Sequence, residues 1–372
     1  MDKLINFCKE HKVQVIGGAV AVVLIIGIII AAVVMNKKET IEPEKETPTT
    51  TVEETTTVEE TTVAEEVNLP SSKLTGEPVD EKIANRRPVA VMINNISDSL
   101  PQSGIEKAGV IYECPVEGGI TRLMAIFDDY SKLKQIGSIR SCRIYYCYFA
   151  LEWDAIYCHF GQSKYAVDFL KSDKIDNVSA YNAPSFYFQT SDRVAPHNTF
   201  INTKGIDGAI KALKYRRKYK DGYQGHFQFA DKDSPVTLDE GTAAKTVEIA
   251  YPHNHPVFQY DKSSGNYLRS QLGNKHIDNL TGHQLAFKNI IIQFVDATLY
   301  PDGKSIDMTV TGSGEGYYIT NGNAIKIKWS KDKKASGQTK YVNAETNEDI
   351  VLNPGKTNIC IVQKSTGVEI SE

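Results

Sequence analysis

The longest uninterrupted hydrophobic stretch lies close to the N-terminus. No residue from Val13 to Asn36 is charged, and residues 15–35 consist only of Val, Ile, Ala, Leu, Gly and Met. About 20 apolar residues in a helix span the roughly 30 Å hydrocarbon layer of a bilayer, whereas the hydrophobic part of a cleaved signal peptide has only about 7–15. We therefore predict an uncleaved transmembrane helix over residues 13–36.

An acidic, threonine-rich segment follows. Residues 37–77 contain two copies of Thr-Thr-Thr-Val-Glu-Glu and, as far as about Thr75, almost nothing that a core could bury. Charged segments of low complexity stay disordered, and self-repulsion extends them. Lysines on both sides of the apolar stretch give only a weak inward-positive bias, but such a spacer is typical of the extracytoplasmic side. We expect residues 1–12 in the cytoplasm and the bulk of the chain outside the cell membrane.

Residues 78–232 alternate between two hydrophobic patterns. Short apolar runs bounded by turn residues predict buried strands, and longer amphipathic runs predict helices. Strands that alternate with helices indicate an α+β or a layered α/β domain. The predicted strands are residues 87–94, 109–113, 120–127 and 154–160, and the predicted helices are residues 143–153, 164–170 and 205–218.

Residues 233–372 carry strand patterns only. Ser-Gly-Asn, Asp-Gly and Asn-Gly pairs separate the apolar runs, and such pairs favour hairpin turns. We predict a second, mostly β domain with a boundary near residue 232. Its strands are expected at residues 257–260, 289–295, 316–320, 324–329 and 358–362.

Charge and cysteine content narrow the possible partners. The formal net charge is -4, so the chain lacks the overall positive field on which nonspecific nucleic-acid binding depends, and no nucleic acid is expected. Cys8 precedes the apolar stretch and therefore cannot be the lipid-bearing cysteine of a processed lipoprotein. The other five cysteines are odd in number and lack CxxC spacing, which favours buried thiols over disulfides or a zinc site. These are Cys114, Cys142, Cys147, Cys158 and Cys360.

A set of ordered motifs resembles a known family. They include residues 87–95 (RPVAVMINN), 101–104 (PQSG), 117–122 (EGGITR), 136–143 (IGSIRSCR), 195–198 (APHN), 267–270 (YLRS) and 352–356 (LNPGK). Together they resemble the YerB-like family of cell-envelope lipoproteins, which combine an N-terminal and a C-terminal domain of unknown function. The resemblance implies an envelope location and a two-domain layout, but no chemistry. The chain departs from the family in its transmembrane anchor and in Cys142, where a small residue is expected.

The richest candidate site is the loop before the first predicted helix. Ser141 is expected at or near the N-cap of that helix. Arg140 and Arg143 then lie where positive charge opposes the helix dipole, so a bound phosphate or carboxylate would stabilise them. Arg122, which follows two glycines on a predicted strand, adds a third guanidinium. The alternative is an internal carboxylate, and the candidates are Glu113, Glu117 and Asp154.

Two histidines add possible acid-base chemistry. The two-residue period of a strand places His159 on one face with Tyr157, and His197 lies beside Asn198 in a predicted loop. With Glu117, the histidines would serve as proton-transfer groups or, less specifically, as metal ligands. No HExxH, GxSxG, P-loop or dinucleotide motif is present, so the common hydrolases and nucleotide enzymes are excluded in their motif-bearing forms, and no cofactor is predicted.

Two classes of function remain open. The first is a noncatalytic envelope protein that binds an anionic cell-wall polymer, or another envelope protein, through Arg122, Arg140, Ser141, Arg143 and Asn198. The second is a hydrolase or transferase that acts on phosphodiester or glycosidic bonds of such a polymer. Contact between His159, His197 and Glu117 would favour the enzyme.

Overall fold

The computed structural model describes residues 69–372. The predicted cytoplasmic tail, the predicted transmembrane helix and most of the predicted acidic spacer lie outside the described residues. Within residues 69–372, no helix is long and apolar enough to cross a bilayer.

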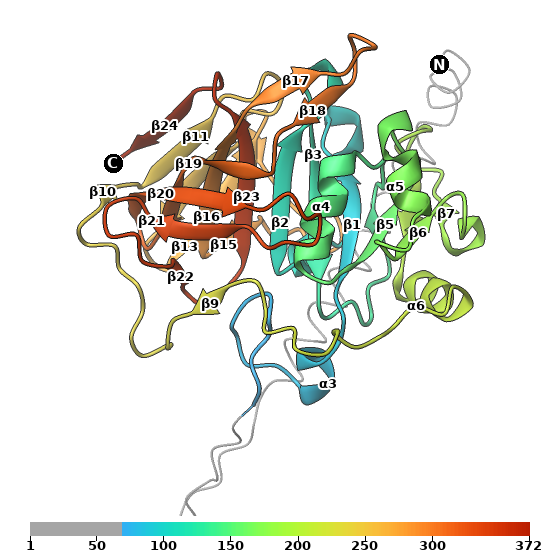
Figure 1. The fold of residues 1–372 in the computed structure, drawn as a ribbon, viewed down its shortest axis with the longest axis horizontal. Helices are drawn as coiled ribbons and strands as arrows, with labels where there is room; N and C mark the ends of the chain where they lie inside the picture. Colours follow the sequence, from blue (N-terminus) through green and yellow to red (C-terminus); the bar gives the residue numbers. More distant parts are fainter. Residues whose placement is uncertain (1–68) are drawn as a thin grey trace, which may run out of the picture. The chain divides into compact units, whose positions relative to one another are not determined.

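A mixed central sheet runs through both halves of the chain (Figure 1). Its two halves meet where β2 pairs in parallel with β23, so the predicted domains share one hydrogen-bonded sheet. The strand order is β10-β20-β19-β16-β23-β2-β3-β1-β5-β6, with β21 paired to β20. The bounds are β1 (Val89–Asn94), β2 (Val110–Pro115), β3 (Thr121–Phe127), β5 (Ile156–His159), β6 (Asn177–Ser179), β10 (Thr242–Ala243), β16 (Asn289–Val295), β19 (Gly312–Thr320), β20 (Asn323–Lys331), β21 (Lys340–Asn343) and β23 (Thr357–Gln363).

The middle of the central sheet, from β16 through β23, β2, β3 and β1 to β5, is buried on both faces. In β1, Val91 and Ile93 belong to one hydrophobic cluster, whereas Ala90 and Met92 belong to the other. Because side chains alternate between faces, a strand covered on both sides is a nearly continuous apolar run. This explains why the strands of this sheet were visible in the sequence as short continuous apolar runs.

Helices cover the two faces of the first half. Helix α4 (Ile144–Glu152) packs Tyr146 and Phe149 into the cluster that contains Met92, while α6 (Thr203–Ala212) packs Ile206 into the opposite one. Helix α6 ends before the predicted residue 218, because the backbone of Lys214 leaves the helical conformation with a positive φ of 59°. The other α-helices among residues 69–372 are α3 (Glu81–Ala84) and α5 (Val167–Lys171).

A second, antiparallel sheet packs on the same hydrophobic cluster as α6. Its strands alternate between buried and partly exposed residues, and Val247, Phe258 and Tyr267 face the core. The described chain is therefore mostly β with few helices, which confirms the predicted β-rich second half. The strands are β11 (Thr246–Ile249), β12 (Val257–Asp261), β13 (Asn266–Gln271), β14 (Asn274–Lys275), β15 (Ala286–Phe287) and β24 (Val368–Ser371).

Short ladders complete the fold. The ladder nearest the candidate site joins β4 (Ile136–Gly137), β8 (Thr199–Ile201) and β7 (Phe188–Gln189). Two others pair β17 (Ala297–Leu299) with β18 (Ile306–Met308), and β9 (Gln228–Phe229) with β22 (Val351–Leu352). The predicted domain boundary falls in the connection between β9 and β10.

The spacer ends earlier than predicted. Leu74 is fully buried, Ser72 and Thr75 are nearly so, and the Gly355 N–H donates to the Thr75 carbonyl at 2.8 Å. Residues 69–77 therefore belong to the folded part, because Leu74 supplies core surface that the polar composition around it conceals.

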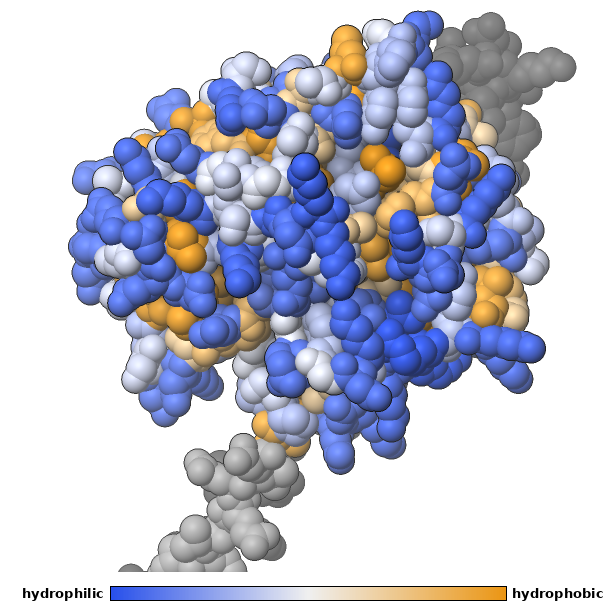
Figure 2. Space-filling model, in the orientation of Figure 1, coloured by the Kyte–Doolittle hydropathy of each residue, from blue (hydrophilic) through white to orange (hydrophobic). Residues whose placement is uncertain are grey.

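The surface and the cysteines agree with a folded module in water. Hydrophilic residues cover most of the face in Figure 2, and hydrophobic ones appear there in small patches. The five cysteines among the described residues are all buried, which confirms their predicted burial.

Candidate functional site

The loop of residues 138–142 lies between the carboxyl ends of two parallel strands. The Asn94 N–H at the end of β1 donates to the Ser138 carbonyl at 2.9 Å, and the Arg140 N–H donates to the Met92 carbonyl at 3.1 Å. On the other side, the Phe160 N–H beyond β5 donates to the Arg140 carbonyl at 3.0 Å. Ligands of open α/β sheets bind at this kind of edge.

Arg143, rather than Ser141, takes the N-cap position of α4. Arg143 has extended φ and ψ of -121° and 150°, and no side chain caps the helix. Ser141 lies two residues earlier, and its carbonyl oxygen accepts hydrogen bonds from the guanidinium groups of Arg122 and Arg143. Ser141 therefore acts at this site through its backbone.

An internal carboxylate pairs with Arg143. The Arg143 Nε lies 2.8 Å from both carboxylate oxygens of Glu117, and the two side chains are 14% and 25% exposed. Burial raises the pKa of Glu117, but the hydrogen bonds and charge of Arg143 outweigh burial and lower that pKa. Of the three carboxylates that were possible partners, Glu113 and Asp154 pair with other arginines.

Arg122 is a buried cation without a carboxylate partner among residues 69–372. It is 6% exposed, its guanidinium donates to the Ser141 carbonyl, and its Nε has no hydrogen-bond partner. Burial, followed by the positive charges of Arg143 and Arg140, lowers the pKa of Arg122 to about 10. The charged form of Arg122 is therefore disfavoured both by its burial and by the two neighbouring guanidinium groups.

Arg140, like Arg122, has a guanidinium group without a carboxylate partner among residues 69–372. Its Nη1 lies 3.4 Å from the Pro196 carbonyl, its Nε is buried without a partner, and no carboxylate in the described part of the chain pairs with it. Burial and the charge of Arg143 lower the pKa of Arg140. We call Arg122, Arg140 and Arg143 the arginine cluster, which holds three guanidinium groups against the single carboxylate of Glu117.

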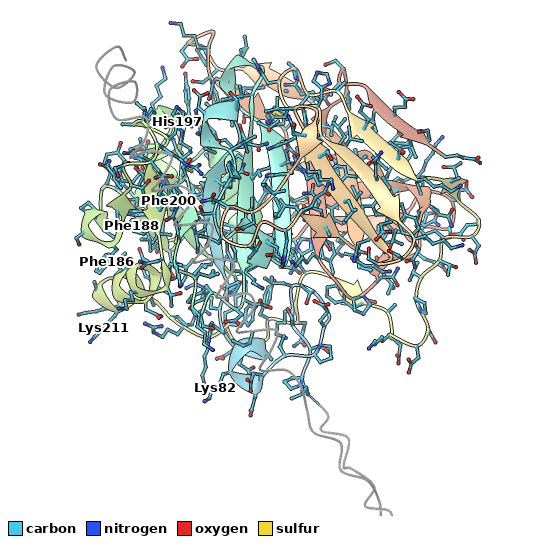
Figure 3. All side chains as sticks on the ribbon, turned by 180° about the vertical axis from the view of Figure 1, so that it is seen from behind. Lys82, Phe186, Phe188, His197, Phe200 and Lys211 are labelled. Atoms are coloured by element: carbon cyan, nitrogen blue, oxygen red, sulfur yellow. The ribbon has the colours of Figure 1, made fainter. Side chains whose placement is uncertain are left out.

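His197 lies beside the arginine cluster. Figure 3 shows it near Phe200 and Phe188 of the β7–β8 pair. The Asn94 Nδ2 lies 2.8 Å from the His197 Nδ1. Because an amide N–H can only donate, Nδ1 accepts and the neutral ring carries its proton on Nε2. Burial and the charge of Arg140 lower the pKa of His197, so the ring favours its neutral form.

Asn198 borders the same loop. Its Nδ2 donates to the Thr190 carbonyl at 3.2 Å, and its Oδ1 is buried without a partner.

His159 is separate from this cluster. It is fully buried, its Nδ1 lies 2.8 Å from the Gly161 carbonyl, and its Nε2 lies 3.3 Å from the Asn177 Oδ1. Burial lowers the pKa of His159. None of the three predicted proton-transfer groups, His159, His197 and Glu117, hydrogen-bonds to another. Within residues 69–372, no group of three His, Cys, Asp or Glu side chains is arranged to hold a metal ion.

Comparisons with known proteins place the chain in a family. Residues 74–216 match the model described as "Protein of unknown function (DUF3048) N-terminal domain", and residues 247–359 match the corresponding C-terminal domain. A Bacillus subtilis (strain 168) protein described as "Putative lipoprotein YerB" is 30% identical over 305 residues, covering 80% of this chain and 88% of that protein. The chain belongs to the YerB-like family. The crystal structure of YerB from Bacillus subtilis superposes with a TM-score of 0.71 at 28% identity, over 81% of this chain and 99% of that chain.

Several motifs that indicated the YerB-like family form a buried polar network instead of the arginine cluster. The Arg269 Nη2 of β13 donates to the Glu113 carboxylate of β2 at 2.7 Å, and the two residues are 1% and 0% exposed. The other Glu113 oxygen accepts from Asn95 at 3.1 Å and from Thr121 at 2.7 Å. This ion pair joins the two family-matched segments, and its high burial indicates a structural role.

The network continues to the edge of the arginine cluster. The Arg269 guanidinium contacts the His276 Nδ1, and the His276 Nε2 lies 2.6 Å from the Gln102 Oε1. Gln102 in turn donates to the Asn94 carbonyl at 3.0 Å, and Asn94 is the residue that contacts His197. Sequence reasoning did not single out Asn94 or Gln102 as site residues, although both belong to motifs of the resemblance.

Proposed function

We propose that this YerB-like protein is an extracytoplasmic, membrane-anchored binding protein that holds an anionic group of a cell-envelope polymer at the arginine cluster. The observation that supports the proposal is Arg122. It is 6% exposed, has an unpartnered buried Nε, and has no carboxylate partner among residues 69–372. A charge buried without a counterion costs several kcal/mol, so a bound anion would be stabilised strongly.

The chemistry of the cluster favours phosphate or carboxylate. Guanidinium groups present planar pairs of N–H donors that match these oxyanions, and charge-assisted hydrogen bonds are about twice as strong as neutral ones. The free donors are Nε atoms of Arg122 and Arg140. Glu117 already neutralises Arg143, so we assign the anion to the other two arginines.

An envelope location agrees with the description of the Bacillus subtilis relative and with the apolar N-terminal residues of this chain. The Bacillus subtilis relative is described as a lipoprotein, and the apolar residues 13–36 would supply the anchor here in place of a lipid. The hydrolase or transferase alternative has no supporting contact, because His159, His197 and Glu117 have separate hydrogen-bond partners.

Titration calorimetry with a glycerol phosphate oligomer tests the proposal. Arg140→Gln removes one charge-assisted interaction of about 1.5–3 kcal/mol, so the affinity should fall roughly 10- to 100-fold. Lys211→Gln is the matched control, because Lys211 is an exposed cation on α6, away from His197 (Figure 3). Equal loss in both variants would indicate general charge attraction and would contradict a specific site. Absence of binding to the unmodified protein would reject the phosphate ligand.

A further inference from the structure

Two thiols meet at the start of α4. The Cys142 Sγ lies 3.4 Å from the Cys147 Sγ, and both residues are fully buried. With Arg143 at the N-cap, Cys142 occupies the position before the cap and Cys147 the fourth helical position. Side chains at these two positions pack together in the hydrophobic staple of a helix N-terminus. Their contact therefore follows from where the helix begins.

We propose that Cys142 and Cys147 form an intrachain disulfide when the protein folds in an oxidising extracytoplasmic compartment. A disulfide has sulfur atoms about 2.0 Å apart, so the pair must approach by about 1.4 Å from its 3.4 Å contact. The other described cysteines, Cys114, Cys158 and Cys360, make no thiol–thiol hydrogen bond within residues 69–372. Among the cysteines of residues 69–372, only Cys142 and Cys147 are arranged for the bond.

The reaction balances with an external disulfide as the oxidant. One cysteine thiolate attacks a sulfur of that disulfide, whose S–S bond breaks and releases one thiolate. The second cysteine thiolate then attacks the mixed disulfide and releases the other. The two cysteine sulfurs each lose one electron, and the two external sulfurs gain them and take up the two protons. Burial raises the pKa of Cys147 well above its ordinary value, so we expect the bond to form during folding, before the pair is enclosed.

The bond would fix the loop that organises the arginine cluster. The Cys142 N–H donates to the Gly161 carbonyl at 3.0 Å, and the adjacent Ser141 carbonyl accepts from Arg122. A link to Cys147 would tie this loop to the first turns of α4. The disulfide rests on the extracytoplasmic location proposed above, but it does not depend on whether the arginine cluster binds an anion.

Peptide mapping of the full-length protein tests the proposal. The protein is purified in detergent, unfolded in urea and refolded with a mixture of reduced and oxidised glutathione. Free thiols are then alkylated under denaturing conditions before digestion with trypsin without reductant. Trypsin cleaves after Arg140, Arg143 and Lys164, so Cys142 lies in peptide 141–143, while Cys147 lies in peptide 144–164. We expect the two peptides to be joined and to separate on reduction.

Variants identify the partner cysteine, because peptide 144–164 also contains Cys158. The joined peptide should persist in Cys158→Ala and disappear in Cys142→Ala and Cys147→Ala. A refolded native protein in which Cys142 is fully alkylated would overturn the proposal. A joined peptide that is lost in Cys158→Ala would also overturn it. The melting temperature of each variant shows whether the chain analysed was folded.

Discussion

The ion pair between Arg143 and Glu117 offers a quantitative test of the arginine cluster. Glu117→Gln keeps the size of the side chain and removes its charge, so three guanidinium groups remain without a carboxylate. The two side chains are 14% and 25% exposed, which places the pair between a surface pair of about 0–1 kcal/mol and a buried pair of about 3–5 kcal/mol. We expect Glu117→Gln to lower the free energy of unfolding by about 2 kcal/mol.

A bound anion should offset this loss. A ligand at about 100 times its Kd stabilises the native state by about 2.7 kcal/mol, and a folded unit of this size changes its Tm by about 2 °C per kcal/mol. Glu117→Gln should therefore melt about 4 °C below the unmodified protein without anion. It should gain more from phosphate than the unmodified protein does, because phosphate then has Arg143 as an additional partner.

Thermal melts at constant ionic strength, with phosphate exchanged against chloride, provide the assay. Glu315→Gln is the control, because Glu315 is an exposed carboxylate on β19. If Glu117→Gln gained no more from phosphate than the unmodified protein and the control, Arg143 would not contact the anion. If phosphate stabilised none of the three proteins, the cluster would not be an anion site.

Three further predictions concern the fold. Burial lowers the pKa of His226 to about 4, so below about pH 6.5 the unfolded state binds a proton that the folded state does not, and stability is lost as the pH falls. His226→Phe keeps the stack on Trp153 and should reduce the slope of the unfolding free energy against pH by about 1.4 kcal/mol per pH unit between pH 6 and 4.5. Glu113→Ala leaves Arg269 buried without its carboxylate, and denaturant unfolding should show a loss of about 3–5 kcal/mol. Leu74→Ala should cost about 2–5 kcal/mol, whereas an unchanged unfolding midpoint would show that residues 69–77 do not stabilise the core.

The sequence predicted strands best where both faces of the sheet are buried. Strands such as β1 and β16 are mostly apolar and are buried at almost every position, so their runs stand out between turn residues. Strand β13 was missed as a strand because its buried positions include Arg269 and Gln271. Their partners, such as Glu113, come from distant segments, and no local pattern reveals that these polar residues are paired.

At the candidate site, residue types indicated the right neighbourhood but not the pairing. The two arginines of the loop and Arg122 do meet, since β1, β3 and the loop are joined by backbone hydrogen bonds. The sequence could not predict which carboxylate pairs with Arg143, because that depends on where the turn that contains Glu117 lies in space. His159 and His197 share no contact, because one lies inside the sheet and the other in a loop.

The most direct test of anion binding measures the NMR signals of the Nε–H groups of Arg122 and Arg140, which lack hydrogen-bond partners. Nitrogen-15 NMR resolves arginine Nε–H signals, and those of Arg122 and Arg140 are assigned by substitution to lysine. Titration with a glycerol phosphate oligomer should shift both signals together along one saturable curve, because both Nε atoms are buried and free to donate. Unchanged Arg122 and Arg140 signals, at concentrations that shift those of exposed arginines such as Arg217, would contradict the account.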